Sequence, residues 1–143
     1  MTEPDELAWE CAKTLYEADV ASRALGMELL DVAPGRARVR MTITEQMLNG
    51  HRIGHGGYVF TVADSAFAFA CNTHDVATVA SSCEIVFLAP VQAGDVLEAT
   101  AREKQRVGRR GVYDVTVTRG VPPEVVAEFR GISSASAKPV LKP

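Results

Sequence analysis

The carboxylate of Asp64 lies in the most apolar segment of the chain, residues 58–71 (YVFTVADSAFAFAC). It is the only acidic or basic side chain between His55 and His74. Burying an unpaired carboxylate is costly, and ionisable groups in apolar surroundings gather at active sites. These facts favour a functional role for Asp64 over a structural one, in which it would bond a neighbouring backbone or hydroxyl group.

A glycine-rich motif, Gly54-His55-Gly56-Gly57, directly precedes this segment. Backbone N–H groups at a helix N-terminus lack intrahelical partners, and glycine lets a ligand approach them closely. Such donors suit a carbonyl oxygen that becomes an oxyanion. Gly56 precedes Asp64 by eight residues, which is about 12 Å along a helix axis. A donor from one chain would therefore face the Asp of another chain more easily than its own.

Two further polar side chains accompany the motif, Asn49 in the preceding loop and His55 within the motif itself. Either side chain would orient a carbonyl, a carboxylate or a water. Each is also common in loops that have no function, Asn49 as a turn residue and His55 as a loop histidine. His51 and His55 do not form the zinc motif HExxH, and no third ligand cluster accompanies them, so we expect no metal site. The chain also lacks the GxSxG motif of serine hydrolases and the GxxxxGK phosphate-binding loop.

A basic cluster brackets an expected hairpin turn at residues 108–111. These positive charges would bind the phosphates of a large anionic substrate. A hairpin tip that is simply exposed to solvent would account for the same cluster equally well. Its members are Arg102, Lys104, Arg106, Arg109 and Arg110.

Composition narrows the function classes. The 143 residues fit one domain, and 15 Lys and Arg against 18 Asp and Glu give a net charge of −3, which disfavours nucleic acid as a partner. No long uncharged apolar run and no apolar signal core occur, so we expect a cytoplasmic protein without a membrane anchor. The three cysteines, Cys11, Cys71 and Cys83, are scattered and fit reduced thiols.

Hydrophobic periodicity predicts a single α+β domain over residues 1–143. A helical extension (about 1–22) precedes a hairpin over 27–43, and the apolar segment 58–71 reads as one long helix. Strands are expected at 77–88, 96–107, 112–118 and 125–133, and a flexible tail at about 134–143. A helix that is apolar all round must be covered by protein, so we expect an antiparallel sheet curled around it.

Several stretches of the chain resemble the acyl-CoA thioesterases of the hot-dog fold, in particular the phenylacetic acid degradation group. They are residues 49–51 (NGH), 55–67 (HGGYVFTVADSAF), 80–90 (ASSCEIVFLAP), 94–95 (GD) and 111–114 (GVYD). The likeness spans about residues 25–133. It implies an antiparallel sheet wrapped around one long helix, subunits joined edge to edge, and an active site between subunits.

The same resemblance implies roles for the residues singled out above. Gly56 would supply the oxyanion N–H, and Asp64 would act as nucleophile or general base. Asn49 and His55 would orient the thioester and the water. Ala80 takes the position where some relatives carry a serine, so the positioning of the water is left open. The expected substrate-binding residues are Gly57, Ser65, Ser81, Ser82, Arg109 and Arg110.

We therefore expect a cofactor-independent acyl-CoA thioesterase, a homodimer or homotetramer, that hydrolyses phenylacetyl-CoA or its ring-hydroxylated relatives in phenylacetate catabolism. Two alternatives stay open. One is a hot-dog enoyl-thioester hydratase or dehydratase, which would pair His55 with Asp64. The other is a non-catalytic acyl-CoA sensor, which usually carries a DNA-binding extension or lacks the carboxylate.

Overall fold

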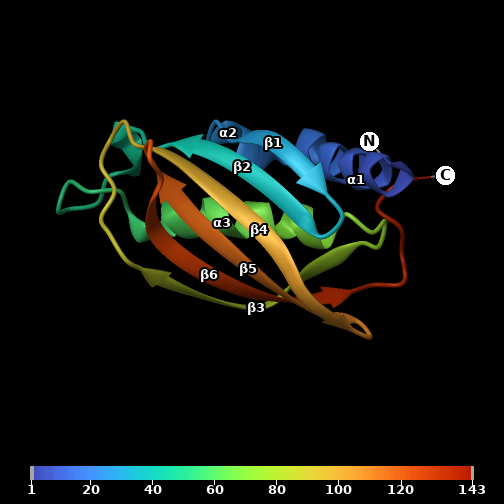
Figure 1. The fold of residues 1–143 in the computed structure, drawn as a ribbon. Helices are drawn as coiled ribbons and strands as arrows, with labels where there is room; N and C mark the ends of the chain where they lie inside the picture. Colours follow the sequence, from blue (N-terminus) through green and yellow to red (C-terminus); the bar gives the residue numbers. More distant parts are fainter. Residues whose placement is uncertain (1, 143) are drawn as a thin grey trace.

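A six-stranded antiparallel sheet curls around helix α3 (Gly56–Cys71) in the computed structural model, which describes residues 2–142 (Figure 1). The predicted α+β class, the buried helix and the N-terminal helix are confirmed. In order across the sheet, the strands are β1 (Glu28–Ala33), β2 (Arg36–Thr42), β4 (Val96–Val107), β5 (Arg110–Arg119), β6 (Glu124–Ala135) and β3 (Thr78–Phe87). The remaining elements are α1 (Glu3–Ala18), α2 (Val20–Ala24) and a 3-10 turn, Glu45–Met47.

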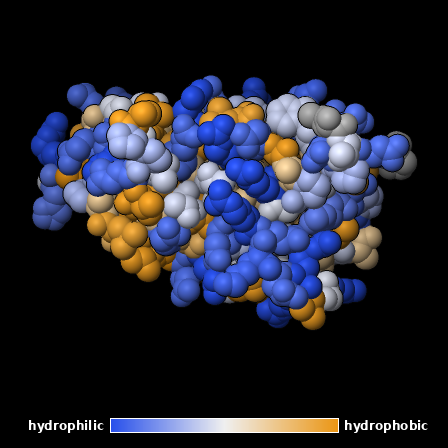
Figure 2. All heavy atoms as spheres, viewed as in Figure 1, coloured by the Kyte–Doolittle hydropathy of each residue, from blue (hydrophilic) through white to orange (hydrophobic). Residues whose placement is uncertain are grey.

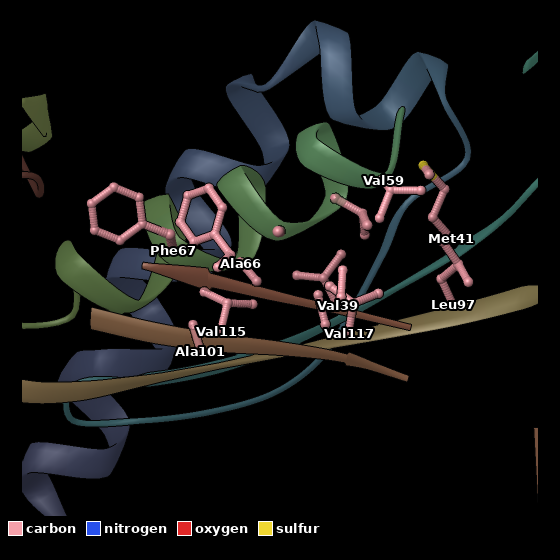
Figure 3. Close-up of a cluster of buried hydrophobic side chains, with 14 of the residues drawn as sticks. Val39, Met41, Val59, Ala66, Phe67, Leu97, Ala101, Val115 and Val117 are labelled. Atoms are coloured by element: carbon pink, nitrogen blue, oxygen red, sulfur yellow. The ribbon is translucent and has the colours of Figure 1, made fainter. Parts of the chain in front are cut away.

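Helix α3 begins two residues earlier than the apolar pattern predicts, because His55 caps its N-terminus. The ring nitrogen Nδ1 of His55 accepts a hydrogen bond from the Gly57 N–H at 2.9 Å. The helix then packs into the curved face of the sheet. Figure 3 shows side chains of α3 meeting those of β2, β4 and β5 in the core. The labelled ones are Val59, Ala66 and Phe67 from α3, and Val39, Met41, Leu97, Ala101, Val115 and Val117 from the sheet.

The N-terminal helices cover the side of α3 that the sheet leaves open. Thr2 and Asp5 form a capping box at the start of α1, and acidic residues in its first turn complement the helix dipole. Near its C-terminus, the Tyr16 hydroxyl donates to the Met27 carbonyl at 2.6 Å. No helix within residues 2–142 is long and apolar enough to cross a membrane.

Strand β6 pairs with β3 through Ala135, so it runs two residues into the segment predicted as a tail. Beyond it, the carboxylate oxygen Oδ1 of Asp75 accepts hydrogen bonds from the backbone N–H groups of Val140 and Leu141. These two hydrogen bonds attach the end of the tail to the segment that follows α3. The flexibility expected of residues 134–143 stays a prediction. Met1 and Pro143, the outer ends of the predicted extension and tail, lie outside the described residues.

Strand β3 lies at the edge of the sheet, and within residues 2–142 only β6 pairs with it. Its end is apolar and exposed: Val86, Phe87 and Leu88 keep 57%, 53% and 57% of their surface accessible. Figure 2 shows hydrophobic atoms gathered over this end of β3, at the lower left, whereas the middle of the visible face is hydrophilic. An unpaired apolar edge of this kind is a template for pairing with another strand.

Candidate active site

The N-terminus of α3 opens onto a largely apolar pocket of about 340 Å³. Gly56 is the first residue of the helix, and its N–H has no acceptor among the described residues. Asn49, Phe87 and Leu88 line the same pocket. A Cβ atom at position 56 would lie 3.0 Å from Cζ of Phe87, so glycine permits this ring to approach the helix terminus closely.

Asn49 holds the loop that leads into the helix. Its side-chain oxygen accepts hydrogen bonds from the N–H groups of His51 (2.9 Å) and Ile53 (3.3 Å). The Asn49 amide nitrogen is therefore the part left to act as a donor toward the pocket. Asn49 and Gly56 thus bring two donors to one cavity, the arrangement that stabilises an oxyanion.

His55 is held in one tautomer by the cap that it forms. Because Nδ1 accepts from the Gly57 N–H, a neutral His55 carries its proton on Nε2 and presents a donor outward. His55 and Asp64 are nine residues apart at the start and in the middle of α3, which is about 13 Å along the axis. The two side chains of one chain therefore do not form an acid–base pair.

Asp64 lies away from the Gly56 pocket and faces strand β3. Its carboxylate oxygen Oδ1 is 4.0 Å from Sγ of Cys83. Burial raises the pKa of Asp64 above its usual range, because desolvation disfavours the charged form. A carboxyl group with a raised pKa is a stronger base once it is ionised.

The predicted substrate-binding residues near α3 have different surroundings. Ser65 is buried, and its hydroxyl lies 2.8 Å from that of Ser22 on α2. The Gly57 N–H is already bonded to His55. Ser81 and Ser82 are exposed on the edge strand, where the pairing with β6 shifts register. Contact between these four residues and a substrate stays a prediction.

Arg109 lies in the exposed β4–β5 turn, and Arg110 is the first residue of β5. Both line a second pocket of about 230 Å³, beyond the C-terminal end of α3. His74 lines it as well, and its Nε2 is 2.8 Å from an oxygen of Glu103. Although burial acts in the opposite direction, hydrogen bonds from Tyr113 and His74 hold the pKa of Glu103 below its usual value. Glu103 does not line this pocket, and its carboxylate pairs with Nε of Arg106 at 3.3 Å. The guanidinium groups of Arg109 and Arg110 are of the kind that suits a phosphate group.

The predicted site residues therefore fall into three places in one chain: Asn49 and Gly56 at one pocket, Asp64 beside β3, and Arg109 with Arg110 at another. The sequence analysis did not single out Phe87 or Cys83. The continuous apolar run over residues 85–89 was the available signal for Phe87. No group of three or more His, Cys, Asp or Glu side chains within residues 2–142 is arranged to hold a metal ion.

Known proteins resemble this chain in sequence and in structure. A family model described as the thioesterase superfamily matches residues 51–126, which include Gly56 and Asp64. The chain belongs to the thioesterase superfamily. It is 47% identical over 126 residues to the Escherichia coli K12 protein named acyl-coenzyme A thioesterase PaaI, and the match covers 88% of this chain and 89% of that protein.

Two further comparisons agree with this family. A putative esterase from Deinococcus radiodurans is 40% identical over 129 residues, with 89% of this chain and 87% of that protein covered. The solved structure of the E. coli PaaI protein, described as coming from the phenylacetic acid degradation operon, matches with a TM-score of 0.91 and 44% identity. That match covers 94% of this chain and 97% of the E. coli chain. The predicted family, the hot-dog fold and the enzyme class of thioester hydrolase are confirmed.

Proposed function

We propose that this thioesterase hydrolyses acyl-CoA thioesters, with phenylacetyl and ring-hydroxylated phenylacetyl groups as its acyl groups, at a site shared by two copies of the chain. The observation that carries the proposal is the unpaired Gly56 N–H at the mouth of an apolar pocket. The pocket wall contains the ring of Phe87, which suits an aromatic acyl group. The E. coli relative named acyl-coenzyme A thioesterase PaaI supports the same substrate class.

In the proposed reaction, the thioester carbonyl oxygen accepts hydrogen bonds from the Gly56 N–H and the Asn49 amide. Attack on the carbonyl carbon moves negative charge onto that oxygen, where these donors stabilise it. Asp64 either attacks the carbon itself or takes the proton of an attacking water. The carbon–sulfur bond then breaks, and CoA leaves as a thiolate that takes up a proton released by the water. If Asp64 attacks the carbon itself, water next hydrolyses the acyl–Asp64 anhydride. On either route water supplies the new oxygen of the free acid. The Nε2–H of His55 is a further donor for orienting the thioester or the water.

Asp64 of the same chain is poorly placed for this role, because it lies about 12 Å along α3 from Gly56 and does not line the Gly56 pocket. A second copy resolves the mismatch. The free edge of β3 and its exposed apolar end offer the surface through which two sheets would join. Two-fold symmetry would then create two equivalent sites, each with Gly56 from one chain and Asp64 from the other.

Edge-to-edge pairing would also bring Arg109 and Arg110 of one chain within reach of a substrate bound at Gly56 of the other. Two antiparallel β3 strands would set Phe87 at the end of one strand near Thr78 of the partner subunit at the start of the other. Thr78 lines the same pocket as Arg109 and Arg110, and Phe87 lines the pocket at Gly56. The acyl end of one substrate would thus occupy the Gly56 pocket of one chain while its phosphates reach the arginines of the partner.

The hydratase alternative has less support, because Nδ1 of His55 already accepts a hydrogen bond from its own helix and the E. coli relative is named an acyl-coenzyme A thioesterase. The sensor alternative also has less support, because a protein that only binds acyl-CoA gives no reason for a half-buried carboxylate at Asp64.

A thiol-release assay tests the proposal. The purified protein is incubated with phenylacetyl-CoA, hydroxyphenylacetyl-CoA, and straight-chain and enoyl-CoA thioesters, and free thiol is followed with a chromogenic reagent. We expect the highest kcat/KM for the arylacetyl substrates and nearly complete loss of thiol release by Asp64→Asn. Hydration of the enoyl substrate without thiol release would favour the hydratase. Tight acyl-CoA binding without turnover would favour the sensor.

A further inference from the structure

Strand β3 brings one side chain to the carboxylate of Asp64, and it is a cysteine. Sγ of Cys83 lies 4.0 Å from Oδ1 of Asp64, within reach of the long hydrogen bond that a thiol makes. Among residues 2–142, no other side chain donates a hydrogen bond to this carboxylate, and no cation pairs with it. Cys83 is partly buried, and the neighbouring residues Ser82 and Glu84 are exposed.

The surroundings keep this thiol protonated, so it is able to donate. Burial and the nearby charge of Asp64 raise the pKa of Cys83 above its usual value. The titratable groups that face Asp64 are Cys83 from β3 and Cys71 from the last turn of α3. Burial raises the pKa of Cys71 to about 12, so it also stays neutral, and its Sγ is directed to the Ala68 carbonyl at 3.5 Å. The S–H group that remains for Asp64 is that of Cys83.

We propose that Cys83 is a positioning residue for Asp64: its thiol donates to Oδ1 and turns Oδ2 toward the reacting thioester or water. This inference rests on the proposed function, in which Asp64 is the nucleophile or base. A thiol is a weak donor. It therefore fixes the orientation of the carboxylate while withdrawing little of its basicity, whereas an arginine or lysine here would hold Asp64 in an ion pair.

Three substitutions separate hydrogen bonding from packing. Cys83→Ala removes both the donor and the volume of the sulfur, Cys83→Val restores volume without a donor, and Cys83→Ser restores a donor. Valine is well tolerated in an edge strand. Glu84→Gln is the matched control, because Glu84 is the next residue of the same strand and its side chain points to the opposite face.

Each variant is measured for thermal unfolding, for kcat and KM with phenylacetyl-CoA, and for the pH dependence of kcat/KM. Losing a hydrogen bond to the ionised form raises the pKa of a carboxyl group. We therefore expect Cys83→Ala and Cys83→Val to lower kcat about threefold to tenfold with little change in KM, and to move the acidic midpoint upward by about half a pH unit. Cys83→Ser and Glu84→Gln should keep the wild-type midpoint.

The inference is overturned if the alanine and valine variants keep the wild-type midpoint, or if valine restores kcat and serine does not. Should the alanine variant fail to fold, the valine and serine variants carry the comparison. A second readout does not need turnover: the carboxyl ¹³C signal of Asp64, assigned by its loss in Asp64→Asn, is titrated in the wild type and in Cys83→Val. Absence of thioesterase activity in the wild type would overturn the proposed function, whereas an unchanged ¹³C titration would overturn the role of Cys83.

Discussion

Replacing Gly56 with proline removes the backbone N–H that we assign to the oxyanion and disturbs the helix little. Proline is favoured at the first position of a helix, where the N–H has no intrahelical partner. The preceding residue must be extended, and His55 already has φ −62° and ψ 131°. The new Cβ would meet the ring of Phe87 at 3.0 Å, and that ring is half exposed rather than enclosed by the core.

The matched control is Gly56→Ala, because it adds the same Cβ and keeps the N–H. Losing one oxyanion donor costs about 10²–10³ in kcat. We therefore expect kcat of Gly56→Pro to lie about two orders of magnitude below that of Gly56→Ala, with similar affinity of both variants for a non-hydrolysable acyl-CoA analogue. Equal kcat values for the two variants would place the oxyanion donor elsewhere.

The same variant tests whether the site is shared. Equal amounts of Gly56→Pro and Asp64→Asn chains are unfolded together and refolded, so that half of the dimers are mixed. Each mixed dimer has one site with both groups intact and one site with neither. The mixture should thus regain about a quarter of the wild-type activity, although each variant alone is nearly inactive. Mixed dimers that are verified by mass spectrometry and yet stay inactive would refute the shared site.

Asp64→Asn should lower kcat by about 10²–10⁴. In the wild type, burial raises the pKa of Asp64, so kcat/KM should fall with decreasing pH around a midpoint above the usual Asp value of about 3.9. The ionised form destabilises the fold above this pKa, and Asp64→Asn should raise Tm at neutral pH. Neutralising Arg109 and Arg110 together should raise KM at low salt and leave kcat nearly unchanged. Gly131→Ala should lower the free energy of unfolding by about 1–3 kcal/mol, since a Cβ there meets the ring of Phe67 at 2.7 Å. Denaturant unfolding measures this loss, which should be smaller in a Phe67→Leu background because the smaller side chain relieves the clash.

The sequence contains strong local signals for much of this fold. Residues 37–43 alternate apolar and polar side chains, and β2 has the same alternation of buried and exposed positions. The apolar run before Cys71 could be placed on one buried helix because its alanines favour helix over strand. By contrast, α2 is too short to show a helical spacing of apolar residues, so the sequence pattern does not predict it. Instead, the N–H and the hydroxyl of Ser22 donate hydrogen bonds to the Asp19 carboxylate and cap this five-residue helix.

The site was harder to predict where it depends on contacts between distant segments. Gly56 and Asp64 stand out by residue type and spacing alone. The contact of Asp64 with Cys83 depends on where β3 lies relative to α3, which the pairing of β3 with β6 determines. Alternation indicates which side chains of β3 face inward, but not which turn of the helix each one meets. Likewise, no local pattern indicates that Ser65 turns away from Asp64 toward α2.

The strand order has a consequence for how the chain folds during synthesis. Strand β3 is the third to leave the ribosome, yet its partner in the sheet is β6, which begins 37 residues after β3 ends. Until β6 emerges, β3 has no partner strand within its own chain along either edge, and the backbone groups that pair with β6 in the finished sheet stay unpaired. Long-range pairing of this kind is slow, and unpaired strands promote aggregation. A nascent chain that ends before Glu124 is therefore the species most in need of a chaperone.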